Sequence, residues 1–295
     1  EHPDIHTHPQ MELGYFLDDN EYEKGEGFLF DKYFPDWSNK YMNLTAETQR
    51  YRGKKLRASA PPRQIKKNHI IAKNAGLYEK EQYIKRLYDH NPECKIVFII
   101  RNPVERSFSA YLMEKNAGFN EFPFSDLKKV IEKKKADKQD WRYRQFVGMS
   151  MYAERIKWLN NYFGKENVQV FTFDQLKKEP VSICKEVFNL LGVDKEYSIN
   201  TEKKHNVSGE VRSKAYSRLL SKLSQKDNPV KILAKSLIPK KTAPKVLNLL
   251  NSLNKKEGKK EAMDEETASF LRNYFREDIE ETERVTGFDL SGWKW

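Results

Sequence analysis

The chain has 295 residues, of which 38% are hydrophobic and 13% aromatic, so its length and aromatic content argue against disorder. Lysine and arginine outnumber aspartate and glutamate by 54 to 43, and the net charge of +11 favours phosphate, sulfate, acidic glycans, nucleic acid or anionic membranes as partners. Two cysteines, Cys94 and Cys184, make no disulfide framework, which favours a reducing compartment.

The predicted elements alternate between strand and helix. Residues 1–5 read as the end of a helix. Three apolar runs rich in isoleucine and valine predict buried parallel strands, and amphipathic patterns predict helices between and after them. The strands are 69–73, 94–101 and 168–173; the helices are 79–90, 103–115, 125–135, 149–163 and 180–191. This order predicts a three-layer α/β fold with a parallel sheet flanked by helices.

Only helical patterns follow Val193, over 213–224, 229–237, 243–253 and 265–286. With no internal repeat, we expect a single domain over 1–295, with 213–260 as a helical insertion or cap. The apolar stripe within 228–254 fits two basic helices packed on a core, and it also suits weak contact with a membrane surface. No apolar run reaches the length of a membrane span, and no signal peptide opens the sequence.

The segment after the second strand carries the strongest chemical signal. The strand brings Arg101 to its carboxyl end, where open α/β sheets bind ligands, and Pro103 begins a helix that carries Ser107 and Ser109. A guanidinium and a hydroxyl near that helix terminus can converge on one phosphate. The alternative for Arg101 is a helix-capping or salt-bridging residue at a strand end.

This segment has the pattern Arg-Asn-Pro, then three residues, then Ser-x-Ser-x-Tyr. The pattern resembles the 3'-phosphate-binding motif of sulfotransferases that use 3'-phosphoadenylyl sulfate (PAPS). In that family the arginine and the second serine hold the 3'-phosphate, which implies these roles for Arg101 and Ser109. Segment 203–212 falls where the family closes a loop over the same phosphate, which implies Lys204 and Arg212. A plain polar linker before a helix would look much the same.

The first residues resemble the family's stretches His-Pro-x-Ile and Lys-Glu-x-His-Phe-Phe, with Met11 and Gly14 replacing the lysine and the histidine. The resemblance implies that Glu12 is the general base, because an acceptor hydroxyl or amine loses a proton as it attacks sulfur. A surface role is the alternative for Glu12, and His8 is a substitute base. The nearby histidines also invite a metal site, but no ligand cluster follows downstream and the family uses no metal.

Residues 70–78 resemble the family's Glu-Lys-Ser/Thr-Pro-x-Tyr turn, with Asn74 and Ala75 replacing the hydroxyl and the proline. The match implies that Lys73 lies near the sulfuryl group and offsets charge on the bridging oxygen; an exposed residue ending a strand is the alternative. Nothing here resembles the family's Lys-x-Gly-Thr-Thr-like loop or a Walker sequence. The resemblance therefore implies that the first strand and phosphosulfate loop precede residue 1, and that 1–295 alone are inactive.

The resemblance implies a P-loop-NTPase-like fold and transfer of a sulfuryl group from PAPS to a hydroxyl or amine, releasing the bisphosphate PAP without a metal. Carbohydrate is the first choice of acceptor, because Glu12 and the sequence motifs most resemble those of glycan-modifying and bacterial members. Lipid, peptide and small-molecule acceptors stay open, and so does the oligomeric state. We expect no nucleic-acid partner and a bacterial cytoplasmic enzyme rather than one of the Golgi lumen. The alternatives are a nucleotide kinase of related fold and a non-catalytic polyanion-binding module.

Overall fold

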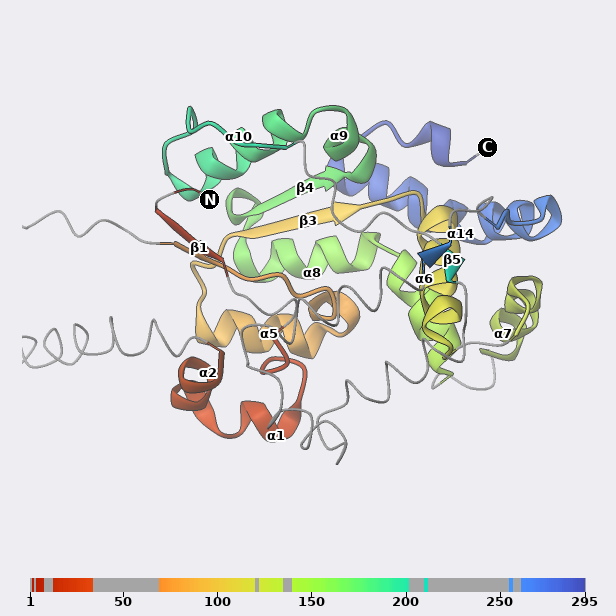
Figure 1. Cartoon of the computed structure of the whole chain (residues 1–295), viewed down its shortest axis with the longest axis horizontal. Coiled ribbons are helices and arrows are strands. Elements are labelled where there is room, and N and C mark those ends of the chain that lie inside the picture. The colour runs from red at the N-terminus through yellow and green to blue at the C-terminus, as the bar shows by residue number, and fades with distance from the viewer. Residues whose placement is uncertain are drawn as a thin grey trace, which may run out of the picture. The chain divides into compact units, whose positions relative to one another are not determined.

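The computed structural model describes residues 2, 4–7, 13–33, 69–119, 122–134, 140–201, 210–211, 255–256 and 261–294 (Figure 1). The chain divides into two compact units. The first consists of Glu1–Ile100 and Glu154–Thr201, and the second of Arg101–Ala153 and Glu202–Trp295. The single domain over 1–295 stays a prediction, and nearly all of 213–260 lies outside the described residues. No described helix is long and apolar enough to cross a membrane.

The first unit holds two pairs of parallel strands. Strand β1 (Ile5–Thr7) pairs with β2 (His69–Ile71), and β3 (Ile96–Ile100) pairs with β4 (Val168–Thr172). The three predicted strands are confirmed, and so is their parallel direction. The helix end expected over 1–5 was wrong at Ile5, which begins β1. Its ladder partner is His69, far along the chain, and such long-range pairing overrides the local pattern.

Strand β3 is buried on one face only. Phe98 and Ile100 are buried, whereas Val97 and Ile99 remain 38% and 43% exposed. The apolar run predicted burial on both faces, because parallel strands in α/β folds are covered on both sides. The sequence was right about the strand and wrong about the burial of these two side chains.

Helices cover the β3–β4 pair from two directions, and Figure 1 shows α8 on one side and α9 with α10 on the other. Helix α10 has the bounds that its pattern predicted: proline occupies its first turn, and Gly192 ends it in a left-handed conformation with φ of +66°. The helices of this unit are α1 (Asp19–Tyr22), α2 (Gly25–Tyr33), α5 (Glu81–His90), α8 (Ala153–Phe163), α9 (Phe173–Lys178) and α10 (Pro180–Leu191), with single 3-10 turns at Leu77–Glu79 and Lys165–Asn167.

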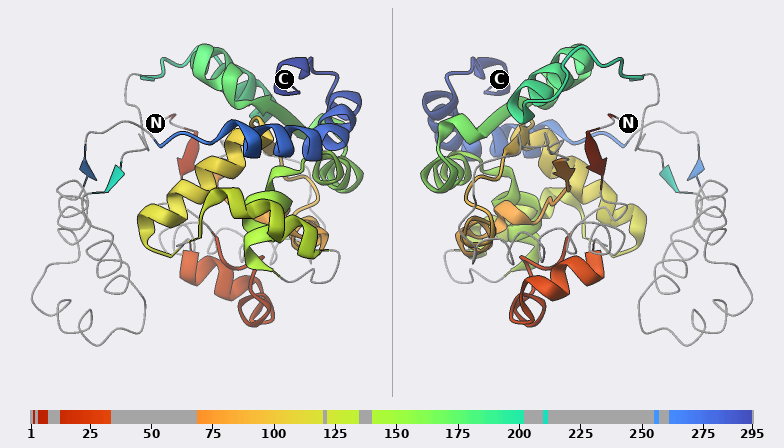
Figure 2. Two further views of the ribbon diagram at one scale, coloured as in Figure 1. Left: turned by 90° about the vertical axis from the view of Figure 1, so that its right-hand side faces the viewer. Right: turned by 90° about the vertical axis from the view of Figure 1, so that its left-hand side faces the viewer.

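The second unit is mainly helical among its described residues. Figure 2 shows α6 (Pro103–Ala117) beside α14 (Glu265–Thr286). The core of this unit includes Phe146, Leu271 and Phe275, which are fully buried. The other elements are α7 (Leu127–Lys134), a π-helical turn (Tyr143–Val147), 3-10 turns at Phe124–Asp126, Gly148–Ser150 and Ser291–Trp293, and the antiparallel pair β5 (Glu210–Val211) and β6 (Lys255–Lys256). The predicted helices over 213–253 lie outside the described residues.

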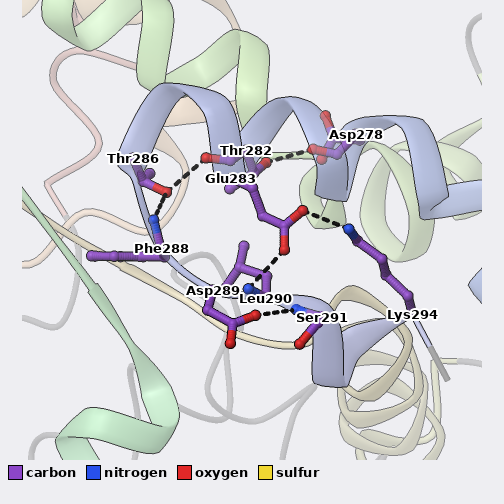
Figure 3. Close-up of polar contacts among 9 residues, drawn as sticks. All are labelled: Asp278, Thr282, Glu283, Thr286, Phe288, Asp289, Leu290, Ser291 and Lys294. Atoms are coloured by element: carbon purple, nitrogen blue, oxygen red, sulfur yellow. Dashed lines mark hydrogen bonds and ion pairs between the residues drawn. The ribbon is translucent and has the colours of Figure 1, made fainter.

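Polar contacts fix the end of the chain against α14 (Figure 3). Glu283 accepts hydrogen bonds from the backbone N–H of Leu290 and from Lys294. The hydroxyl of Thr286 donates to the carbonyl of Thr282, one turn earlier. Trp293, which follows this network, is buried. The end of the chain is therefore packed through an aromatic anchor whose polar neighbours are satisfied.

Both cysteines are free thiols. Desolvation raises the pKa of the Cys94 thiol to about 11, and it also raises the pKa of Cys184. Both side chains are therefore protonated near neutral pH, so neither is a poised nucleophile. The chemistry of this chain must come from other groups.

Candidate active site

The turn from β3 into α6 is held by an asparagine. The Asn102 side chain accepts hydrogen bonds from the backbone N–H groups of Val104 and Glu105, at 3.0 and 3.3 Å, and Pro103 occupies the first helical turn. Asparagine is a preferred N-cap and proline a preferred first residue, so the sequence Arg-Asn-Pro itself explains why the helix begins here. Sequence reasoning did not assign this role to Asn102, although the capping preference could have revealed it.

The cap changes how an anion can bind at this terminus. Two N–H groups of the first turn, which would otherwise be available to a phosphate, are already satisfied by Asn102. The field of the helix still favours negative charge near its N-terminus. The directed contacts to a phosphate must therefore come from side chains.

Arg101 supplies one such side chain. It is about one third exposed, and its Nε and Nη2 atoms both donate to the same carboxylate oxygen of Glu105, at 3.1 and 3.0 Å. Ser109 lies four residues beyond Glu105 on α6, which places the two on one face of the helix. Arg101, just before α6, thus contacts Glu105 on the helix face that also carries the half-buried Ser109.

The two serines of the motif differ sharply. Ser107 is fully buried, and its hydroxyl has no hydrogen-bond partner among the described residues. Ser109 follows by two residues, which turns its side chain about 200° around the helix axis toward the face of Glu105. Only the second serine is therefore placed to share a ligand with Arg101.

Lys73 follows β2 in the first unit, and its side chain is exposed. The next residue, Asn74, donates from its side-chain amide to the carbonyl oxygen of Leu13 at 2.8 Å. The family pattern has a hydroxyl where Asn74 stands, and here the amide ties the turn to a distant segment. Lys73 therefore extends from a turn whose backbone is anchored, while Arg101 directly precedes the N-cap of α6, the helix that carries Ser109.

The other predicted site residues, Glu12, Lys204 and Arg212, lie outside the described residues, as does the substitute base His8. The first histidine serves the fold: His2 is buried, its Nδ1 accepts from the N–H of Asp4, and its Nε2 lies 3.1 Å from the carbonyl oxygen of Asp194. The part of the chain that the structure describes contains no cluster of three or more side chains suited to a metal ion.

Comparisons with known proteins identify the family. Residues 80–283, more than half of the chain, match the sulfotransferase domain family, and the chain belongs to it. Its fold is similar to that of a sulfotransferase from Alicyclobacillus acidocaldarius, with a TM-score of 0.55 and 18% identity over 100% of this chain and 90% of that one. The search of the curated proteins found no match.

The family match and the structure agree on the α/β class. The fold is the P-loop-like α/β fold of sulfotransferases, as the resemblance implied, and among the described residues its parallel strands form two pairs, β1–β2 and β3–β4. The matched residues include Arg101 and Ser109, whereas Glu12 and Lys73 precede them. Membership of the family shows a transferase of sulfuryl groups.

Proposed function

We propose that this chain takes its sulfuryl group from PAPS and transfers it to a hydroxyl or amine acceptor, with a carbohydrate as the first choice. The observation that carries the proposal is the ion pair of Arg101 with Glu105, on the face of α6 that also carries Ser109. Two N–H groups of Arg101 already hold one anionic oxygen of Glu105, so the guanidinium suits a phosphate oxygen in the same fork. The 3'-phosphate of PAPS fits that place chemically.

Glu105 is compatible with this role because its ion pair is weak. Both partners are partly exposed, at 32% and 55%, and exposed pairs contribute little to stability. Glu105 can therefore orient the guanidinium before the ligand arrives and release it to a phosphate, which carries more charge. Ser109 then donates its hydroxyl hydrogen to a second phosphate oxygen. Lys204 and Arg212 are the proposed further contacts to this end of the nucleotide.

The proposed transfer step needs two groups at the other end of the donor. Glu12 accepts the proton that the acceptor hydroxyl or amine loses as its oxygen or nitrogen forms the new bond to sulfur. The bond between sulfur and the bridging oxygen breaks at the same time, and its electron pair stays on the 5'-phosphate of PAP. Lys73 offsets the charge on that oxygen. No metal takes part in this scheme.

The binding of PAP tests the proposal directly. PAP is titrated into the chain by calorimetry, and Arg101→Ala is expected to weaken binding by about 100-fold, because a charge-assisted bidentate contact is worth about 3 kcal/mol. Arg272→Ala is the matched control, because Arg272 also forms an ion pair, with Glu265 on α14. The control should change PAP binding less than about threefold through net charge alone.

Two results would contradict the proposal. Salt-sensitive binding to heparin that Arg101→Ala leaves unchanged, without PAP binding, would favour a polyanion-binding module. Tighter binding of ATP than of PAP would favour a nucleotide kinase. The location that we propose, the bacterial cytoplasm, rests on the two free cysteines, which fit a reducing compartment.

A further inference from the structure

The second unit contains a pocket that the proposed transfer step does not use. Its volume is about 380 Å³, and it lies between the second half of α6, the segment around Phe124 and the residues just before α14. Pockets for small ligands begin at about 300 Å³ and combine apolar walls with a few polar groups. This pocket has both features.

Aromatic rings form the walls, and they are fixed by one another. The Phe108 and Tyr111 rings are stacked, with an interplanar angle of 14°, and the ring of Phe124 lies 5.0 Å from each of them. The Tyr111 hydroxyl donates to the carbonyl oxygen of Phe122 at 3.0 Å. Because that hydroxyl is already bonded, the walls present ring carbons to a ligand. The apolar side of the pocket is therefore formed in advance, which lowers the entropy lost on binding.

The rim supplies a donor and an acceptor side by side. The Lys115 ammonium donates to both carboxylate oxygens of Glu261, at 2.7 and 2.6 Å. An ammonium donates hydrogen bonds and a carboxylate accepts them, so the pair can bind a ligand that carries hydroxyl groups, which do both. Both side chains are partly exposed, at 24% and 39%, so a ligand can reach them.

The described lining residues of the pocket do not favour an anionic occupant. Lys115 and Glu261 compensate each other, and Asp264, which also lines the pocket, adds a negative charge. These described lining residues therefore carry a slight net negative charge, although the whole chain carries +11. Neither a nucleotide nor a sulfated product suits this pocket electrostatically. A neutral ligand with one apolar face and a hydroxyl edge does.

We infer that this pocket binds a neutral, unsulfated sugar ring of the acceptor. A sugar ring presents axial C–H groups on one face, which pack on Phe108 and Tyr111, and hydroxyl groups at its edge, which reach Lys115 and Glu261. Phe108 directly precedes Ser109 on α6, so one helix carries the phosphate contact on one face and the sugar contact on another. The inference rests on the proposed function, because it specifies the carbohydrate acceptor named there.

Titrations with three neutral disaccharides test the inference: cellobiose, lactose and N,N'-diacetylchitobiose, followed by NMR of the full chain. At least one should bind, and Phe108→Leu should weaken that binding by about fivefold, because leucine keeps the apolar volume but loses the flat ring. Glu261→Gln should weaken it by about threefold. Phe270→Leu is the matched control, because Phe270 is a half-buried aromatic of the same unit that stacks on Tyr274 away from the pocket.

The inference is overturned if none of the three disaccharides binds, or if Phe108→Leu and Glu261→Gln both leave binding unchanged. It is also overturned if 4-nitrophenol, an aromatic probe without a sugar, binds in the pocket while the disaccharides do not. Thermal melting checks that each variant folds. If Phe108→Leu does not fold, the effect of Glu261→Gln on disaccharide binding tests the inference by itself. Loss of the sugar contact with PAP binding intact removes this inference alone, whereas failure to bind PAP removes the proposed function and leaves the sugar result standing.

Discussion

The chain leaves a parallel strand through a polar turn after β2 and again after β3, and different contacts hold the two turns. After β3, Asn102 caps the next helix within three residues, and Glu105 holds the guanidinium of Arg101. All of these contacts are local. The candidate residues Arg101 and Ser109 therefore lie just before and on a helix whose first turn is already capped by Asn102.

The turn after β2 is held from a distance. Asn74 donates to the carbonyl oxygen of Leu13, which precedes it by 61 residues, and its own side-chain oxygen is buried without a partner among the described residues. Lys73 extends from this turn into solvent. The comparison shows that a candidate site at a strand end can be predicted from sequence when the residues that anchor the turn are neighbours in the chain, as they are after β3.

After Arg101→Ala, the largest effect expected at the junction of β3 and α6 distinguishes its two serines. Ser109→Ala should weaken PAP binding by about 10- to 100-fold, because a hydrogen bond to a charged group is worth about 1.5–3 kcal/mol. Ser107→Ala should leave PAP binding unchanged and should not lower the melting temperature, because it removes a buried hydroxyl that has no partner in the described structure. Calorimetry and thermal unfolding measure both effects. Equal losses of PAP binding in the two variants would contradict the proposed orientation of α6.

A smaller effect of opposite sign is expected at Glu105. Glu105→Gln should tighten PAP binding by about three- to tenfold at low salt, because the variant removes a negative charge next to the phosphate and ends the competition for Arg101. The gain should shrink as salt rises, since the groups are partly exposed. Glu132→Gln, an exposed glutamate of α7, is the control for net charge. Weaker PAP binding in Glu105→Gln would show that orienting the guanidinium outweighs repulsion.

Much of the fold follows from local signals in the sequence. Helix α14 runs from Glu265 to Thr286 as its pattern predicted, because Asp264 caps its start and Gly287 ends it with φ of +75°. Strand β1 was not predicted, because its three residues depend on a partner strand that no local pattern reveals. Short elements such as α9 were also missed, although the capping box of Thr172 and Gln175 marks its start.

The same distinction between local and long-range contacts applies to the candidate site and to the pocket. The family resemblance paired Arg101 with Ser109 from the sequence, and this pairing stays a prediction; helical spacing adds that Glu105 and Ser109 lie on one face. The aromatic pocket beside α6 could not be predicted, because its rim joins Lys115 to Glu261 across 146 residues. The tie between Asn74 and Leu13 is equally invisible in the sequence. Local contacts could be predicted from the sequence, whereas long-range contacts required the structure.

The smallest effect is expected at the β2 turn. Lys73→Ala should weaken PAP binding by only about two- to threefold, because the exposed ammonium of Lys73 is proposed to offset charge on the 5'-phosphate oxygen of PAP, and exposed charge pairs contribute less than about 1 kcal/mol. The melting temperature should stay the same, since the turn is anchored by Asn74 rather than by Lys73. Calorimetry beside Arg101→Ala measures the contrast. A loss of PAP binding as large as that in Arg101→Ala would show that Lys73 forms a directed contact to a phosphate, and the two strand ends would then bind the nucleotide equally strongly.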